Sequence, residues 1–272
     1  MGAMKPPLLR HALVGEFLGT ALLILLGDGV VASVVLLDKQ ANWIVITTGW
    51  GLAVTLGVYL SGRLSGGHLN PAVTLALASR GEFPSSRVMP YWIAQVAGAF
   101  VGAMLVYVDY ADAFHAFEQT EGIVRGAMVE GRLAGKAAGG AGVFATFPEF
   151  STLWRNVFSE FIGTAVLLMG VRAIGDPRNA RPAPGIAPIL VGLTVWSIGL
   201  SLGGLTGYAI NPARDFGPRL AAFVCGWGGS VFQSHNAYFV VPLLAPLAGG
   251  VFGIWLYDLT IAPNLPEVDE GE

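Results

Sequence analysis

Long runs of apolar residues, separated by short polar connections, dominate the chain. A helix needs about 20 apolar residues to cross a hydrocarbon core about 30 Å thick, and six runs approach or exceed that length. They cover residues 12–37, 43–61, 88–108, 154–174, 185–203 and 237–258. The pattern predicts an all-α membrane protein with six transmembrane helices.

Two further apolar segments, at 70–79 and 211–221, are too short to cross. A segment that enters a membrane without crossing it must be buried in protein or line water, because its backbone polar groups need partners. Each segment begins with Asn-Pro, and asparagine is a favoured N-cap while proline suits the first helical position. We therefore expect two re-entrant half-helices that start at Asn70 and Asn211. The alternative is that each Asn-Pro forms an ordinary surface turn.

The two halves of the chain repeat each other. GEFLGTALLILLG at 15–27 is echoed by SEFIGTAVLLMG at 159–170, and Asn70-Pro71-Ala72 returns 141 residues later as Asn211-Pro212-Ala213. Each copy holds three spans, an odd number, so the second copy must lie inverted in the membrane. Paired, interrupted segments at matching positions of inverted repeats indicate a translocation path.

We therefore expect a single channel domain over residues 1–272. The inverted repeats would cover approximately 10–108 and 154–258, and the connection 109–153 would join them on the extracellular side. A flexible loop is the default interpretation of this long connection. The alternative is that it folds into the outer vestibule and shapes access to the channel.

Composition supports the membrane assignment and excludes several classes. Hydrophobic residues make up 54% of the chain and charged residues only 12%, about half the ~25% of soluble domains. A net charge of −3 offers no basic surface to nucleic acid. The one cysteine, Cys225, forms no internal disulfide, and the four histidines show no metal-ligand spacing. We expect no cofactor, no metal and no enzyme activity.

Lysine and arginine are concentrated at the N-terminus and in the second and fourth connections. These eight of the 15 basic residues are Lys5, Arg10, Arg63, Arg80, Arg87, Arg172, Arg178 and Arg181. The first connection has only Lys39, and basic residues are more than offset by acidic ones in the third. Because positive loops stay inside, we expect both termini in the cytoplasm, an acidic tail at 267–272, and a location in the cell (cytoplasmic) membrane.

Inversion brings the starts of the two half-helices together near the midplane of the bilayer. Their positive dipole ends would then form a barrier to cations and protons. The side-chain amides of Asn70 and Asn211 remain donors for the oxygen of a neutral solute. These features indicate a pore for uncharged molecules.

The paired Asn-Pro-Ala motifs, six spans and repeated Glu-Phe-x-Gly-Thr pattern resemble the major intrinsic proteins, the aquaporin family. The similarity covers about residues 10–258. It implies six tilted helices, two re-entrant half-helices and a homotetramer with one pore in each subunit. Asp215, after the second motif, and Pro242 in the last span resemble the glycerol uptake facilitators, or aquaglyceroporins.

Matching the facilitator pattern position by position implies a narrow selectivity filter of four residues, Trp50, Gly199, Tyr208 and Arg214. Arg214 would donate to hydroxyl oxygens and repel cations. Trp50 and Tyr208 would form an apolar corner, and Gly199 would leave the lumen wide. Tyr208 departs from the facilitators, which usually have phenylalanine there, and its hydroxyl would trim the pore or add a polar group.

Alternative roles exist for most of these residues. Trp50 could be an interfacial aromatic, and Arg214 could simply pair with Asp215. Glu16 and Glu160 occupy equivalent intramembrane positions. The family resemblance implies that they accept hydrogen bonds from the re-entrant loops, and the alternative is a proton relay.

Two polar residues near the expected pore remain. His68 precedes the first motif, so the carbonyls beside it would line the cytoplasmic half of the pore; a pH gate is the alternative. Asp28 lies toward the outer end of the first span, and we expect a vestibule or loop contact there. Asp215 completes the set of residues expected to support the pore.

The function that these features favour is passive diffusion of glycerol and other small uncharged solutes, with water permeation and exclusion of ions and protons. Urea, dihydroxyacetone, lactic acid and hydrogen peroxide are candidate further solutes. The first alternative is a water-selective channel. The second is a secondary active transporter, which would need a titrating carboxylate that faces the lumen.

Overall fold

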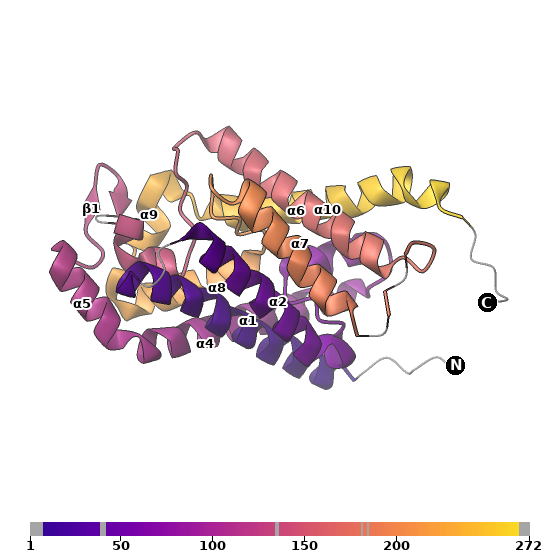
Figure 1. The fold of residues 1–272 in the computed structure, drawn as a ribbon, viewed down its shortest axis with the longest axis horizontal. Coiled ribbons are helices and arrows are strands. Elements are labelled where there is room, and N and C mark those ends of the chain that lie inside the picture. The colour runs from indigo at the N-terminus through magenta and orange to yellow at the C-terminus, as the bar shows by residue number, and fades with distance from the viewer. Residues whose placement is uncertain (1–7, 39–41, 134–135, 181, 184, 267–272) are drawn as a thin grey trace.

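The computed structural model describes residues 8–38, 42–133, 136–180, 182–183 and 185–266. Lys5, Lys39, Arg181 and the acidic tail 267–272, on which the predicted orientation partly rests, lie outside the described residues. The start of α1 and the end of α10 lie at the same end of the elongated molecule (Figure 1).

Six long helices correspond to the six predicted spans. Their bounds are α1 Leu9–Leu37, α2 Trp43–Ser65, α4 Val88–Asp109, α6 Leu153–Gly175, α7 Ala187–Leu202 and α10 Val240–Thr260. Within the described ranges, all of them except α7 are long and apolar enough to cross a membrane. The α7 helix has 16 residues and is apolar; it packs between α2 and α6 (Figure 1).

Two short helices start where the Asn-Pro motifs predicted. They are α3, Pro71–Ser79, and α8, Pro212–Ala222. Each asparagine is the N-cap: Asn70 Oδ1 accepts from the backbone N–H of Ala72 at 2.8 Å, and Asn211 Oδ1 accepts from that of Ala213 at 3.0 Å. The motifs are therefore helix starts rather than surface turns.

The half-helices link the two halves of the chain. Both α3 and α8 pack against α4 and α10, so each half-helix contacts a long helix from the other half. The long helices show the same symmetry, because α1 packs against α2 and α4 while α6 packs against α7 and α10. Residues far apart in sequence thereby meet at the centre of the molecule.

Glycines allow the closest of these helix contacts. A Cβ atom on Gly98 of α4 would clash with the carbonyl oxygen of Phe17 in α1. At the equivalent contact in the second half, a Cβ on Gly249 of α10 would clash with the carbonyl oxygen of Phe161 in α6. Small residues let membrane helices approach to backbone contact, and here they fix the same packing in both halves.

Large apolar side chains cover the outside of the helices, as expected of a surface that faces lipid. Exposed examples are Leu18, Leu52, Leu56, Ile93, Leu105, Leu193, Leu200, Leu244 and Phe252. An apolar outer surface of this extent needs hydrocarbon around it.

The connection 109–153 is folded, so the prediction of a flexible loop was wrong. Its elements are α5 Ala111–Glu121, the antiparallel pair β1 Met128–Val129 and β2 Arg132–Leu133, and a 3-10 helix at Lys136–Val143. Phe114 and Phe144 from this connection stack at 5.4 Å and pack edge-on against Trp227. The segment after the 3-10 helix then reaches α8. A further short helix, α9 Ser230–Ala237, precedes α10.

Candidate functional site

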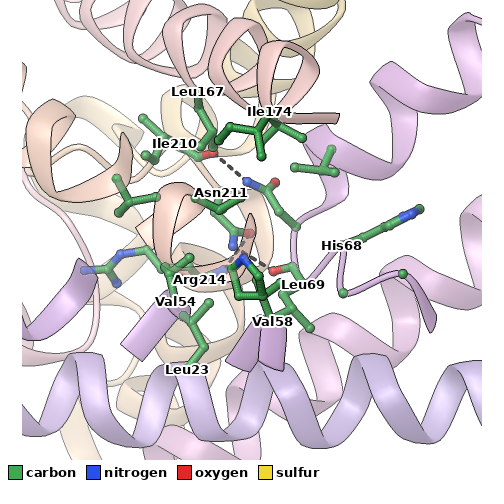
Figure 2. A pocket seen from close by; sticks show the side chains of 18 of the residues that line it. Leu23, Val54, Val58, His68, Leu69, Leu167, Ile174, Ile210, Asn211 and Arg214 are labelled. Atoms are coloured by element: carbon green, nitrogen blue, oxygen red, sulfur yellow. Dashed lines mark hydrogen bonds between the residues drawn. The ribbon is translucent and has the colours of Figure 1, made fainter. Parts of the chain in front are cut away.

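Two cavities lie along the centre of the molecule and meet at one place. The inner cavity has a volume of about 510 Å³ and reaches from His68 and Asn70 to Arg214. The outer cavity, of about 440 Å³, is lined by the folded connection, by residues of α1 and α2, and by His235 of α9. Trp50, Tyr208 and Arg214 line both cavities, so these three side chains form the junction between them. Figure 2 shows Arg214 and His68 on opposite sides of Asn211.

Arg214 is held at the junction by contacts on several sides. It follows the Asn211 cap in the first turn of α8, where its backbone N–H donates to Asn211 Oδ1 at 3.2 Å. Its guanidinium donates from Nη1 to the carbonyl oxygen of Phe144 at 3.1 Å and lies 4.0 Å from the ring of Trp50. The side chain is almost fully buried, and Arg214 lines both cavities.

The ring of Tyr208 packs over Gly199. A Cβ atom on Gly199 would lie 2.8 Å from Tyr208 Cζ. The ring also meets Trp43 edge-on at 5.9 Å, and the Trp43 indole donates to the carbonyl oxygen of Gly199 at 3.0 Å. The space that Gly199 leaves is therefore occupied by the tyrosine ring, whose hydroxyl is buried without a hydrogen-bond partner among the described residues.

The side chain of Trp50 packs against Gly27 on the neighbouring helix α1. A Cβ atom on Gly27 of α1 would come within 2.6 Å of Trp50 Cε3. The indole therefore lies flat against α1, where it is 3% exposed. It is part of the junction and not an aromatic residue at the lipid interface, because its ring faces Arg214.

Asn70 and Asn211 hold the two half-helices together. Asn70 Nδ2 donates to the carbonyl oxygen of Ile210 at 2.9 Å, and Asn211 Nδ2 donates to that of Leu69 at 2.8 Å (Figure 2). An amide has two N–H donors, so each asparagine keeps one beyond this reciprocal bond. Both asparagines line the inner cavity.

The remaining members of the two motifs support the helix starts. Pro71 and Pro212 occupy the first helical positions, and Ala72 and Ala213 are fully buried. A first-turn proline needs no hydrogen-bond partner for its nitrogen. Ala72 lies against Gly250 of α10, where a Cβ atom on the glycine would be 3.3 Å from the Cβ of Ala72.

Glu16 and Glu160 stabilise the two loops that precede the half-helices. Glu16 accepts from the backbone N–H groups of His68 and Leu69 at 3.0 and 2.7 Å, and from Gln95 Nε2 at 2.6 Å. Glu160 accepts from Ala209 and Ile210 in the same way, at 3.0 and 2.8 Å.

The two loops carry matching backbone strain. Leu69 and Ile210 have φ angles of +51° and +42°, a region that non-glycine residues occupy at a cost of about 1–3 kcal/mol. The carboxylates of Glu16 and Glu160 compensate by binding the backbone N–H groups of these residues. Both glutamates are fully buried and line neither cavity, so their position fits loop support rather than a proton relay.

His68 lies at the wall of the inner cavity, in an aromatic group. Its Nδ1 is 3.1 Å from Thr74 Oγ1, and its ring packs against Phe83 at 4.9 Å and Tyr91 at 5.2 Å. The backbone at this point also lines the cavity through Gly66 and Gly67. The ring is therefore held by contacts with its neighbours.

Asp215 pairs with Arg219 and not with Arg214. Arg219 Nε donates to Asp215 Oδ1 at 2.8 Å, while Thr146 donates to Oδ2 from its backbone at 2.8 Å and from its hydroxyl at 2.7 Å. Arg219 also donates to the carbonyl oxygens of Thr146 and Val231. Asp215 thus anchors the folded connection to α8, and the alternative of an Arg214–Asp215 pair is wrong.

The Asp215–Arg219 pair was not predicted from the sequence. The i, i+4 spacing of Asp215 and Arg219 was a visible signal for their pairing, whereas nothing local marked Phe144 or Thr146 as neighbours of the junction.

Asp28 was expected in the vestibule or a loop contact, and this was wrong: it is fully buried on α1 and lines neither cavity. Among the described residues, no group of three or more His, Cys, Asp or Glu side chains could hold a metal ion.

Comparison with known proteins agrees with this geometry. The family model described as Major intrinsic protein matches residues 4–257. The chain is 50% identical over 248 residues to a probable glycerol uptake facilitator protein of Thermotoga maritima, covering 90% of this chain and 97% of that protein. It is 42% identical over 261 residues to the glycerol uptake facilitator protein of Haemophilus influenzae, covering 95% and 96%. The solved structure of the aquaglyceroporin from Plasmodium falciparum superposes with a TM-score of 0.82 at 33% identity, covering 94% of this chain and 98% of that one.

Proposed function

The chain belongs to the major intrinsic protein family, and from this premise we propose that it conducts glycerol and other small uncharged solutes, together with water. Family membership makes it a multi-pass integral membrane protein and a passive transporter, not an enzyme. No energy source or cofactor enters the proposal. The solute moves down its own gradient.

One observation carries the proposal: the only residues common to the linings of the two described cavities are Trp50, Tyr208 and Arg214. A solute that passes between the cavities must pass these three side chains. Arg214 offers guanidinium donors on one side, and the two aromatic rings are apolar. This arrangement suits a molecule with hydroxyl groups along one edge and C–H groups along the other.

Gly199 contributes to the filter indirectly in this proposal. Because it has no side chain, the Tyr208 ring can lie back against α7. The lumen is thereby widened by the position of the ring, not by an empty space beside the glycine.

Beyond the junction, the solute exchanges hydrogen bonds with Asn70 and Asn211. Each side-chain amide has one N–H left after the reciprocal bond and lines the inner cavity. The N-termini of α3 and α8 meet here, and their positive dipole ends oppose the passage of cations and protons. The free amide N–H groups can donate to the hydroxyl oxygen of a neutral solute.

The finer features of assembly and location are also part of the proposal. Both Arg80 and Arg172 pair with Asp258 near the end of α10, at 2.6 and 2.7 Å. The rule for orientation counts lysine and arginine rather than net charge, so arginines at this end support a cytoplasmic position for both termini in the cell membrane. We expect one channel domain with inverted repeats at about 10–108 and 154–258, assembled as a homotetramer.

Stopped-flow light scattering on proteoliposomes tests the proposal. Vesicles exposed to a glycerol gradient should shrink rapidly and then reswell rapidly, while an impermeant sugar gradient of equal osmolarity should give shrinkage alone. Protein-free vesicles provide the background rate. Rapid shrinkage without protein-dependent reswelling in glycerol would show a water-selective channel and refute the proposed solute class.

A further inference from the structure

Asp28 is a buried carboxylate that the transport path does not use. It lies on α1 with no exposed surface, and neither carboxylate oxygen has a hydrogen-bond partner among the described residues. Buried polar groups nearly always have such partners, and an isolated buried charge is expensive. Its position therefore needs an explanation.

Arg214 provides the opposite charge. Its Nη1 lies 3.6 Å from Asp28 Oδ1, which is an ion-pair separation and too long for a hydrogen bond. The Arg214 guanidinium is itself turned toward Phe144 and Trp50. Asp28 therefore sits behind the guanidinium, away from both cavities.

The other buried acid near Arg214, Asp215, already has its own hydrogen-bond partners. Asp215 Oδ1 and Oδ2 accept from Arg219 and Thr146 at 2.7–3.1 Å. The four charges thus form two pairs, Asp215 with Arg219 and Asp28 with Arg214. Only the second pair includes a residue of the junction.

We propose that Asp28 is the counter-charge of Arg214 and a specificity-determining residue of the channel. Charges a few ångströms apart interact strongly in a poorly hydrated interior. By offsetting the guanidinium charge from behind, Asp28 leaves Arg214 able to donate to hydroxyl oxygens without retaining small anions. This role rests on the proposed function of Arg214 at the constriction.

Two neighbouring residues of α1, Gly27 and Asp28, contact the junction residues. The ring of Trp50 packs against Gly27, where a Cβ atom would lie 2.6 Å from Trp50 Cε3. The next residue, Asp28, faces Arg214. One turn of α1 therefore supports two of the three junction residues from behind. The same helix therefore positions one junction side chain and compensates the charge of another.

Inhibition of water efflux by nitrate tests the proposal in proteoliposomes. Nitrate is a planar anion that suits a guanidinium group and has no neutral form at pH 7. An impermeant sugar gradient drives water efflux, with gluconate replacing nitrate in the reference medium. We expect nitrate to inhibit the Asp28→Asn protein at concentrations about fivefold lower than the wild type, as lost charge compensation strengthens anion binding.

Asp38→Asn is the matched control, because Asp38 is an exposed aspartate at the end of the same helix. It should keep the nitrate sensitivity of the wild type. Equal sensitivity of the Asp28→Asn protein and the wild type would overturn the counter-charge role. Because the readout is water efflux, this result is independent of whether the wild type reswells in glycerol, which tests the proposed function.

A double variant covers the case in which Asp28→Asn accumulates poorly. Removing one partner of a buried pair leaves an uncompensated charge, whereas removing both does not. Asp28→Asn combined with Arg214→Gln should then recover the folded yield in membranes. Failure of the double variant to exceed the single one would also overturn the proposal, since the two charges would not be coupled.

Discussion

The aromatic ring of Tyr208 lies against Gly199, at a distance that no side chain on the glycine would permit. A Cβ atom at position 199 would stand 2.8 Å from Tyr208 Cζ and 3.0 Å from Cε2. Tyr208 also lines both cavities. The width of the junction therefore depends on the contact between these two residues.

Replacement of Gly199 by alanine should push the Tyr208 ring toward the junction. Extra volume in a packed site displaces neighbouring side chains, and a narrower junction hinders glycerol more than the smaller water molecule. We therefore expect glycerol flux to fall about tenfold and water flux by less than about twofold, where tenfold corresponds to about 1.4 kcal/mol. Stopped-flow reswelling and shrinkage rates measure the two fluxes. Gly62→Ala is the control, because a Cβ there meets nothing within 4 Å; equal loss of both fluxes in Gly199→Ala would refute the filter assignment.

Tyr208→Phe should leave selectivity unchanged. The hydroxyl oxygen is buried and has no hydrogen-bond partner among the described residues, so we expect it to make no contact with a passing solute. Its removal relieves an unsatisfied group, and we expect the free energy of unfolding to rise by about 1 kcal/mol or less. Glycerol and water fluxes with thermal unfolding in detergent check both points; a large fall in glycerol flux alone would show that the hydroxyl contacts the solute.

Glu160→Gln should destabilise the second re-entrant loop. The substituted amide presents only one acceptor oxygen to the backbone N–H groups of Ala209 and Ile210, so we expect a loss of about 2 kcal/mol in unfolding free energy. Thermal unfolding measures it, with the exposed Glu130→Gln as the control. A proton relay would instead predict pH-gradient-driven glycerol uptake in the wild type that the variant loses; loop support predicts none in either protein.

Arg219→Met should destabilise the protein far more than the same substitution of an exposed arginine. The side chain is 1% exposed and is bound to Asp215, Thr146 and Val231. Breaking a buried pair costs about 3–5 kcal/mol, because the remaining carboxylate lacks compensation. Unfolding of Arg219→Met, Asp215→Asn and the double variant gives the coupling energy; additive losses would mean that the two residues act independently.

Several features followed from the sequence because they are local or periodic. Apolar run lengths gave the long helices, and the Asn-Pro pairs gave the starts of α3 and α8. The repeat also placed Glu16 and Glu160 as a symmetric pair. In each case the determining physics, hydrophobic length or capping chemistry, lies within a few residues of the chain.

The tertiary structure alone decided which charges and rings meet. Arg214 and Asp215 are adjacent in sequence, yet successive helical residues point in different directions. Their side chains therefore pair with Asp28 on α1 and Arg219 on α8. The fold of the connection 109–153 could not be predicted from the sequence either. Its core of Phe114, Phe144 and Trp227 forms only when three distant segments pack together.

A membrane channel with two inverted copies, and the positions of its motifs, could thus be predicted from the residues alone. That Tyr208 fills the space beside Gly199 and that Asp28 stands behind Arg214 became visible only in the folded chain. Hydrophobic length and helix capping act along the chain, whereas packing and charge compensation depend on distances between helices. These distances are set by all the contacts together.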